Sequence, residues 1–417
     1  MAPVRRRIPL YALYGADAIS LTGNAVTQIA IPWFVLTTTG SATLTALAVF
    51  VNFLPIVLAA FFGGVVVDRL GFRATSVLGD LASAGAVAAI PLLYTTVGLA
   101  LWQLMILVFV GSLLDAPGST ARAALLPDLV ELADVPMERA SGIRGAIQQG
   151  ATLVGAPLGG VLISTVGATN ALWLDSASFL FSAALVVVAV PRPGSNASPE
   201  EPGRFLAELG EGIRFIRSGR LLRAMILTVL VSNLLDAPFP VIMPVFAKDA
   251  YGSATDLGLM YGTLGGAALV GALVYSAIGH RLPRRATFVT CFAFFPLSFL
   301  VLATTPPLPV ALVALAIVGL ASGPVNPLIF TIVAELVPTQ LRGRVFGAVR
   351  ALAWASIPLG IMLGGVAVTE IGVAATFLAI GVSYTALVAY GFVNPAFRAM
   401  DRARPSEAAA ASGTAAG

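Results

Sequence analysis

The stretch "GGVVVDRLGFR" at residues 63–73 separates two long apolar runs and gives the turn between them an unusual composition. Its polar and turn-forming residues include two glycines, Gly64 and Gly71, together with Asp68, Arg69 and Arg73. Glycine permits a tight turn and the close approach of helices, and an aspartate can lie against the positively polarised N-terminal end of another helix. A turn that only set topology would need neither the aspartate nor both glycines.

The composition outside this turn is that of an integral membrane protein. Of 417 residues, 58% are hydrophobic and 11% are charged, whereas soluble proteins carry roughly 25% charged residues. The first apolar run continues to about Leu36, beyond the length of a signal-peptide core, so we predict an uncleaved first span. We expect an all-α polytopic protein with 12 transmembrane helices, near 10–36, 44–66, 75–97, 100–124, 143–166, 170–190, 222–246, 256–279, 286–304, 308–333, 345–368 and 372–394.

The distribution of basic residues predicts the orientation of these spans. With the N-terminus in the cytoplasm, only Lys248 of the 24 lysines and arginines falls outside. The positive-inside rule therefore places both termini in the cytoplasm, and we expect a bacterial cytoplasmic (inner) membrane location. Because the arginines flank spans, the net charge of +4 gives no support to nucleic-acid binding.

Internal repeats indicate two halves. "DRLGFRAT" at 68–75 is echoed by "HRLPRRAT" at 280–287, and "APLGG" at 156–160 by "IPLG" at 357–360. A six-plus-six duplication is the usual architecture of secondary transporters. We therefore predict four regions: a first six-helix bundle at 1–190, a cytoplasmic linker with an amphipathic surface helix at 191–221, a second bundle at 222–394 and a disordered cytoplasmic tail at 395–417.

Two aspartates stand deep in apolar runs, within "SLLDAP" at 112–117 and "NLLDAP" at 233–238. A charge at mid-membrane costs about 2.5 to 3.5 kcal/mol, so Asp115 and Asp236 are expected to exchange protons when water reaches them. The prolines that follow, Pro117 and Pro238, interrupt helical hydrogen bonding and predict a bend beside each acid. We predict that the two aspartates are a cavity pair.

Asp17, in the first span, is a third candidate, and the asparagines Asn24, Asn233 and Asn326 are polar candidates for the same cavity. The alternative is that such aspartates satisfy a neighbouring backbone group or arginine and only hold helices together.

Catalytic and metal sites are not expected. The chain has one cysteine, Cys291, and one histidine, His280, so neither a metal cluster nor a Ser/His/Asp set can be assembled without relying on a single residue. No G-x4-G-K-[ST] loop is present, so ATP is not expected to drive the protein. We predict no enzymatic activity and no cofactor.

The opening motif resembles the cytoplasmic loop signature between the second and third spans of the major facilitator superfamily, with Phe72 at its second basic position. In that family the contact of the loop aspartate with the N-terminal end of another helix latches the outward-open state. The resemblance therefore implies a latch role for Gly64, Asp68, Arg69, Gly71 and Arg73. "GATLVGAPLGG" at 150–160 resembles the fifth-span motif of the family's antiporters through Gly155, Pro157, Gly159 and Gly160, with Ala156 inserted before the proline.

The phrases "LTGNAVTQIAIPWFVLTTTGSA", "LAELGEGIRFIRSGRLLR" and "LVPTQLRGRVFGAVR" extend this resemblance to nearly the whole chain. They look like the twelve-span drug:proton antiporter branch that includes macrolide-efflux and Tap-type multidrug exporters. The resemblance implies a monomeric transporter that exports amphipathic, cationic or similar small molecules in exchange for protons. Export or import of an endogenous metabolite or siderophore is the alternative. Members often carry an acid where this chain has Asn24, and Asp17 is the candidate substitute.

Overall fold

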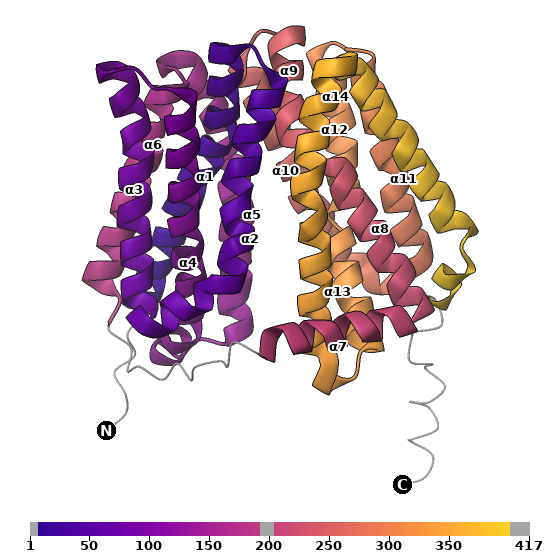
Figure 1. The fold of residues 1–417 in the computed structure, drawn as a ribbon. Coiled ribbons are helices and arrows are strands. Elements are labelled where there is room, and N and C mark those ends of the chain that lie inside the picture. The colour runs from indigo at the N-terminus through magenta and orange to yellow at the C-terminus, as the bar shows by residue number, and fades with distance from the viewer. Residues whose placement is uncertain (1–6, 192–203, 401–417) are drawn as a thin grey trace, which may run out of the picture.

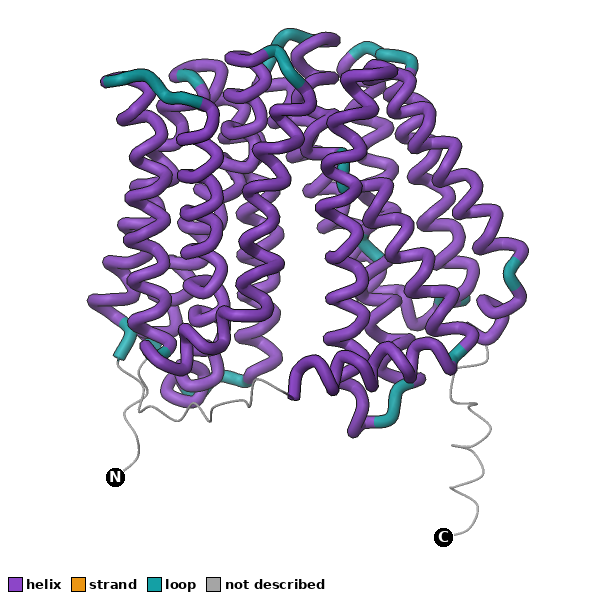
Figure 2. The backbone as a smooth tube through the Cα atoms, viewed as in Figure 1, coloured by secondary structure: helices purple, strands orange, loops and turns teal. Residues whose placement is uncertain are grey.

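The computed structural model describes residues 7–191 and 204–400, without the side chains of residues 59–69 and 204–208. Within those ranges every regular element is a helix (Figure 2). Ten stretches are long and apolar enough to cross a membrane. One of them turns at Gly372 and contains two crossings, and α2 (Ala42–Leu70) supplies one more. The expectation of a twelve-helix, all-α membrane protein is confirmed.

The first bundle consists of α1 to α6, each of which is one crossing (Figure 1). Its bounds are α1 Ile8–Thr39, α2 Ala42–Leu70, α3 Phe72–Thr96, α4 Leu101–Ala133, α5 Met137–Val166 and α6 Ala168–Ala189. The turns are short because glycines at the helix ends adopt left-handed backbone angles. Gly40 (φ 67°) ends α1, and Gly71 (φ 78°) precedes α3.

The second bundle consists of α8 to α14 and repeats the arrangement with two interrupted crossings. Its bounds are α8 Arg220–Asp236, α9 Phe239–Ala250, α10 Ala254–Ile278, η1 Gly279–Arg281, α11 Arg284–Ala303, α12 Leu308–Ser322, α13 Val325–Leu336, η2 Thr339–Leu341 and α14 Arg342–Val393. A proline stands in the break of both interrupted crossings, at Pro238 and Pro324. Gly372 (φ 83°) makes the turn that folds α14 into two antiparallel spans.

The helix α7 (Arg204–Ser218) connects the bundles and lies across the end of the second one (Figure 1). Its apolar face is partly buried, because Ile216 packs with Leu222 and Val345. A Cβ at Gly212 would collide with the carbonyl oxygen of Arg344, so only glycine allows this close approach to α14. Residues 192–203, which we expected to be a flexible linker, lie outside the described part of the chain.

The segment after α14 differs from our expectation of a disordered tail from residue 395. Residues 395–400 form the short helix η3 (Pro395–Met400). Phe397 and Met400 are fully buried, and the Phe397 ring stacks on Phe288 with centroids 5.6 Å apart. These two apolar side chains hold the segment against the bundle. The rest of the expected tail, 401–417, lies outside the described residues.

The two bundles meet at the end opposite α7. Thr43 and Thr369 share a hydrogen bond of 2.8 Å between α2 and α14, and Ser164 and Thr255 share one of 2.7 Å between α5 and α10. An apolar cluster extends the contact from this end towards the middle of the fold. Its members include Ala46, Val49, Ala237, Val241 and Ile361. The structure therefore closes the space between the bundles on the side away from α7.

The outer faces of both bundles are apolar. Large exposed side chains such as Val188, Phe181, Leu273 and Phe392 stand on helix surfaces, and Val188 is 86% exposed. An apolar surface of this extent fits contact with lipid and does not fit contact with water.

Candidate functional site

A fully buried arginine connects helices at the centre of the first bundle. Arg122 on α4 donates from Nε to Asp17 on α1 at 2.9 Å and from Nη1 to Asp80 on α3 at 2.5 Å. Arg144 on α5 donates to the second oxygen of Asp17 at 2.9 Å, and Ser182 on α6 donates to Asp80 at 2.7 Å. The partners lie on α1, α3, α4, α5 and α6, so the network connects five helices. Separating any of its buried ion pairs would leave an uncompensated charge, which is costly.

Asp115 extends the network towards accessible space. It stands two helical turns before Arg122 on α4, and its Oδ1 lies 3.9 Å from Nη2 of that arginine. Its Oδ2 accepts a hydrogen bond of 3.2 Å from Asn24 on α1. Oδ1 is buried and has no hydrogen-bond partner among the described residues. The Asp115 side chain is 22% exposed, against 2% for Asp17, so Asp115 is the acid of the network that a solute can reach.

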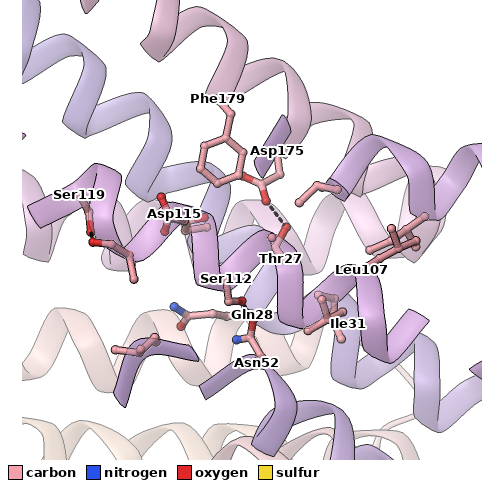
Figure 3. A pocket seen from close by; sticks show the side chains of 17 residues that line it. Thr27, Gln28, Ile31, Asn52, Leu107, Ser112, Asp115, Ser119, Asp175 and Phe179 are labelled. Carbon is pink, nitrogen blue, oxygen red and sulfur yellow. Dashed lines mark hydrogen bonds between the residues drawn. The ribbon is translucent and has the colours of Figure 1, made fainter. Parts of the chain in front are cut away.

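A cavity of about 180 Å³ borders Asp115. Its lining combines a polar set with apolar side chains from the same helices (Figure 3). The polar set is Asn24, Thr27, Gln28, Asn52, Ser112, Asp115, Ser119 and Asp175. Pockets that enclose drug-sized ligands measure about 300 to 1,000 Å³. In this conformation the cavity can therefore take a small solute or one end of a larger amphipathic molecule.

Asp175 supplies a second carboxylate to the cavity from α6. It accepts a hydrogen bond from Thr27 at 2.5 Å (Figure 3) and another from Ser178 at 3.3 Å. A Cβ at Gly23 would overlap the Oδ1 of Asp175, so the glycine on α1 makes room for this acid. The cavity thus has two carboxylates, Asp115 and Asp175, both from the first bundle.

Asp236 has different surroundings from Asp115. It ends α8 in the second bundle and lies beside the hydroxyl of Tyr384, which donates to the carbonyl of Ser232 at 3.2 Å. Asn233 donates to the carbonyl of Ala353 on α14 at 2.9 Å. Asp115 therefore contacts an asparagine and an arginine, whereas Asp236 lies beside a tyrosine. The structure does not bring the two aspartates into one polar contact.

The prolines that follow the two aspartates also act differently. α4 continues unbroken through Pro117, whereas the helical hydrogen bonding stops between Asp236 and Phe239. In α4, Pro117 lacks an N–H group, and this removes only the helical hydrogen bond to the carbonyl of residue 113. Pro238 and Pro240 together remove the bonds to residues 234 and 236, which is enough to end the helix. Of the two bends expected from the sequence, only the second is an interruption.

The remaining polar candidates are dispersed. Asp17 is buried and paired with two arginines, so it lies in the network and not in the lining of the cavity. Asn326 is exposed near the start of α13 in the second bundle, also away from that lining.

The turn at residues 63–73 is described only in part. The side chains of Gly64, Asp68 and Arg69 lie outside the described set. Gly71 precedes α3 with a left-handed φ of 78°, as a tight turn requires. Arg73 donates to the carbonyl of Val187 on α6 at 2.6 Å. The latch role of the motif stays a prediction.

The glycines of the fifth span place α5 between two other helices. Cβ atoms at Gly155 and Gly159 would lie 2.7 Å from Ala25 and 3.1 Å from Val26, both on α1. A Cβ at Gly160 would lie 2.5 Å from the carbonyl of Ala254 on α10, and Pro157 packs on Gly262 of the same helix. The motif therefore makes a close contact between the bundles.

The sequence analysis did not identify three members of the network, Arg122, Asp80 and Arg144, or the cavity acid Asp175. Asp80 in "LGDLAS" and Asp175 in "LWLDSAS" are intramembrane acids, and the criterion applied to Asp115 applies to them too. Arg122 fell near the expected end of its span, because α4 is longer than predicted and runs to Ala133. Arg144 lies at the start of its predicted span, where the positive-inside rule already accounts for an arginine.

Comparison with known proteins agrees with this architecture. The family model described as "Transmembrane secretion effector", of the major facilitator superfamily, matches residues 1–412. The multidrug efflux pump Tap of Mycolicibacterium fortuitum is 33% identical over 405 residues, which cover 95% of this chain and 98% of that protein. Macrolide efflux protein A of Streptococcus pyogenes is 24% identical over 398 residues, covering 93% and 96%.

Solved structures show the same fold at low sequence identity. The nucleoside transporter NupG, in a mutant form, aligns with a TM-score of 0.76 and 12% identity over 94% of this chain and 99% of that one. A D-xylose-proton symporter aligns with a TM-score of 0.69 and 12% identity, with the same coverage of both chains. Two bundles of six crossings, a polar cavity inside the first and a family match over almost the full length agree: the chain belongs to the transmembrane secretion effector family of the major facilitator superfamily, and it is a membrane transporter, not an enzyme.

Proposed function

We propose that the protein exports amphipathic small molecules, cations among them, from a bacterial cytoplasm in exchange for protons by alternating access. The relatives named as a multidrug efflux pump and a macrolide efflux protein support the substrate class and the direction. The main support for coupling to protons is the balance of charge in the first bundle.

The buried acids of the first bundle outnumber their basic partners. Asp17, Asp80 and Asp115 contact Arg122, and Arg144 also contacts Asp17. Asp175 adds a fourth carboxylate at the cavity. Four carboxylates minus two guanidinium groups leave two negative charges if all are ionised. Isolated charges are expensive in a low-dielectric interior, so a proton or a cationic solute that neutralises one of them binds favourably.

Asp115 is the best candidate for the exchanged proton. Asp17 and Asp80 each accept charge-assisted hydrogen bonds from arginine, which stabilise their ionised forms. Asp115 keeps one oxygen without a hydrogen bond among the described residues and faces the cavity. A proton and a cation that compete for this one carboxylate give exchange, because each is released when the other binds.

Alternating access is supported by the position of the contacts between bundles. They lie opposite α7, so this conformation is closed on that side. The charge distribution of the sequence supports a cytoplasmic position for α7, and with that orientation this conformation is the inward-facing one. Export then requires that the α2–α14 and α5–α10 contacts separate while the bundles close near α7. We propose that a single chain performs the cycle in the cytoplasmic membrane.

The test uses the full chain, purified and reconstituted in vesicles, with ethidium and a macrolide as probes. An imposed proton gradient should drive uphill transport that an uncoupler abolishes. Asp115→Asn should remove uphill transport while downhill movement or binding of the probe remains. Asp128→Asn, an exposed acid on the same helix, is the matched control and should transport like the parent. Uphill transport by Asp115→Asn at the parent rate would refute the coupling role, and transport insensitive to the proton gradient would refute proton exchange.

A further inference from the structure

A second cavity, of about 470 Å³, lies at the α7 end of the second bundle and is separate from the cavity at Asp115. The first turn of α8 forms one wall, and the end of α14 together with η3 forms the other. Three arginines line it, namely Arg220, Arg223 and Arg398. No acidic side chain of the described residues belongs to its lining.

The three arginines are available for a ligand. All three are exposed, and none has an ion pair or side-chain hydrogen bond with another residue in the described ranges. A guanidinium group presents parallel N–H donors that match the oxygens of a phosphate. Three such groups around one cavity, with no described acid in its lining, make it complementary to a phosphate anion.

The wall that carries Arg398 is held in place by the fold. Asn394 turns the chain after α14, since its side-chain oxygen accepts from the backbone N–H of Ala396 at 2.9 Å. Phe397 is fully buried, and its ring contacts Phe288 at 5.6 Å and Tyr390 at 6.1 Å between centroids. The basic cavity therefore exists before any ligand arrives, which reduces the entropy lost on binding.

An apolar groove continues from this cavity along the outer face of α14. Ala386, Ala389 and Val393 line the groove, and Tyr390, Asn394 and Pro395 belong to both the groove and the cavity. Val393 is 80% exposed on the surface that faces lipid. A phosphate site that opens directly onto a lipid-facing apolar groove has the two parts that a phospholipid requires.

We propose that this site binds an anionic phospholipid, with the phosphate headgroup among Arg220, Arg223 and Arg398 and one acyl chain along the groove. Basic pockets at the membrane surface recognise anionic headgroups in this way. The groove selects a diacyl lipid over a soluble phosphate, because a free phosphate has no group to place there. The site is independent of the transported solute.

The test measures lipid binding to the purified full chain in detergent by native mass spectrometry, with phosphatidylglycerol and phosphatidylcholine of identical acyl chains. The parent should prefer phosphatidylglycerol by about tenfold or more. The combination of Arg220→Gln, Arg223→Gln and Arg398→Gln should abolish the preference. The control combination, Arg214→Gln with Arg217→Gln, removes two exposed arginines from α7 and should keep it.

Three results would overturn the proposal: equal binding of the two lipids by the parent, an undiminished preference in the triple variant, or full displacement of phosphatidylglycerol by inorganic phosphate at millimolar concentration. If the triple variant does not fold, Arg223→Gln alone provides the test, with a loss of about fivefold in affinity for phosphatidylglycerol expected from one surface arginine. Unchanged affinity in that variant would equally refute the site.

Discussion

The hydroxyl oxygens of Thr43 and Thr369 lie 2.8 Å apart, although the residues belong to different bundles and are separated by 326 positions in the chain. The contact exists only while the side opposite α7 is closed. Its formation and loss would therefore report the movement between the bundles that the proposed alternating-access cycle requires.

A cross-link at this contact should stop transport. Thr43→Cys with Thr369→Cys, in a Cys291→Ser background, should form a disulfide under mild oxidation, and export should fall to background until a reductant is added. Each single cysteine variant, treated in the same way, should keep parent activity. The cross-link is verified by mobility on gels. Full export by the cross-linked protein would mean that this side does not open during the cycle.

A bulky side chain at the α5–α10 contact should oppose closure of the same side. A Cβ at Gly258 already lies 2.7 Å from the carbonyl oxygen of Ala156, so Gly258→Val cannot keep the present approach. We expect this variant to reduce Thr43→Cys/Thr369→Cys cross-linking at least severalfold and to lower export. Gly265→Ala, whose new methyl group has 3.7 Å to its nearest neighbour, is the control and should cross-link normally.

Neutralising the central arginine should destabilise the protein. Arg122→Gln leaves Asp80 buried without an arginine and Asp17 with Arg144 alone, and the loss of one partner of a buried ion pair costs about 3 to 5 kcal/mol. The apparent Tm in detergent should fall clearly, and adding Asp17→Asn and Asp80→Asn should restore part of it because the unpaired charges are gone. Arg214→Gln should leave Tm unchanged. A parent-like Tm for Arg122→Gln would show that the network contributes little to stability.

The motif at residues 63–73 gives a prediction that rests on the sequence. Asp68→Asn should reduce transport strongly while the protein remains folded in the membrane, because the motif resembles a conformational latch. Transport is measured beside expression and monodispersity. A normal transport rate in Asp68→Asn would exclude the latch role.

The orientation can be checked by labelling in intact cells. In a Cys291→Ser background, an impermeant thiol reagent added outside should label Ser253→Cys and should not label Ala409→Cys. The reversed pattern, or labelling at both positions, would contradict the positive-inside prediction.

The membrane fold could be predicted from the sequence because run length and charge placement are local properties. Asp115 could also be selected, because an acid in an apolar run is visible without a structure. The partners of that acid could not be predicted in the same way. Asp17 and Asp80 are 105 and 42 residues from Arg122 in the chain, and only the packing of α1, α3 and α4 brings them together. The repeated "LLDAP" suggested equivalence, but the extra Pro240 makes the second copy break its helix.

That extra proline gives the two copies of the repeated sequence different backbone structures. The first copy lies on a continuous helix, where Asp115 is next to Arg122, and under the proposed function it contributes to the binding of the solute. The second copy lies where the helix is interrupted. There the carbonyls of residues 234 and 236 have lost their helical partners, and Gly364 of α14 packs directly against Pro238. The choice of transported solute and the movement between the bundles could therefore change independently. Substitutions around Asp115 would alter which molecules are carried, and substitutions around Pro238 would alter how fast any of them is carried.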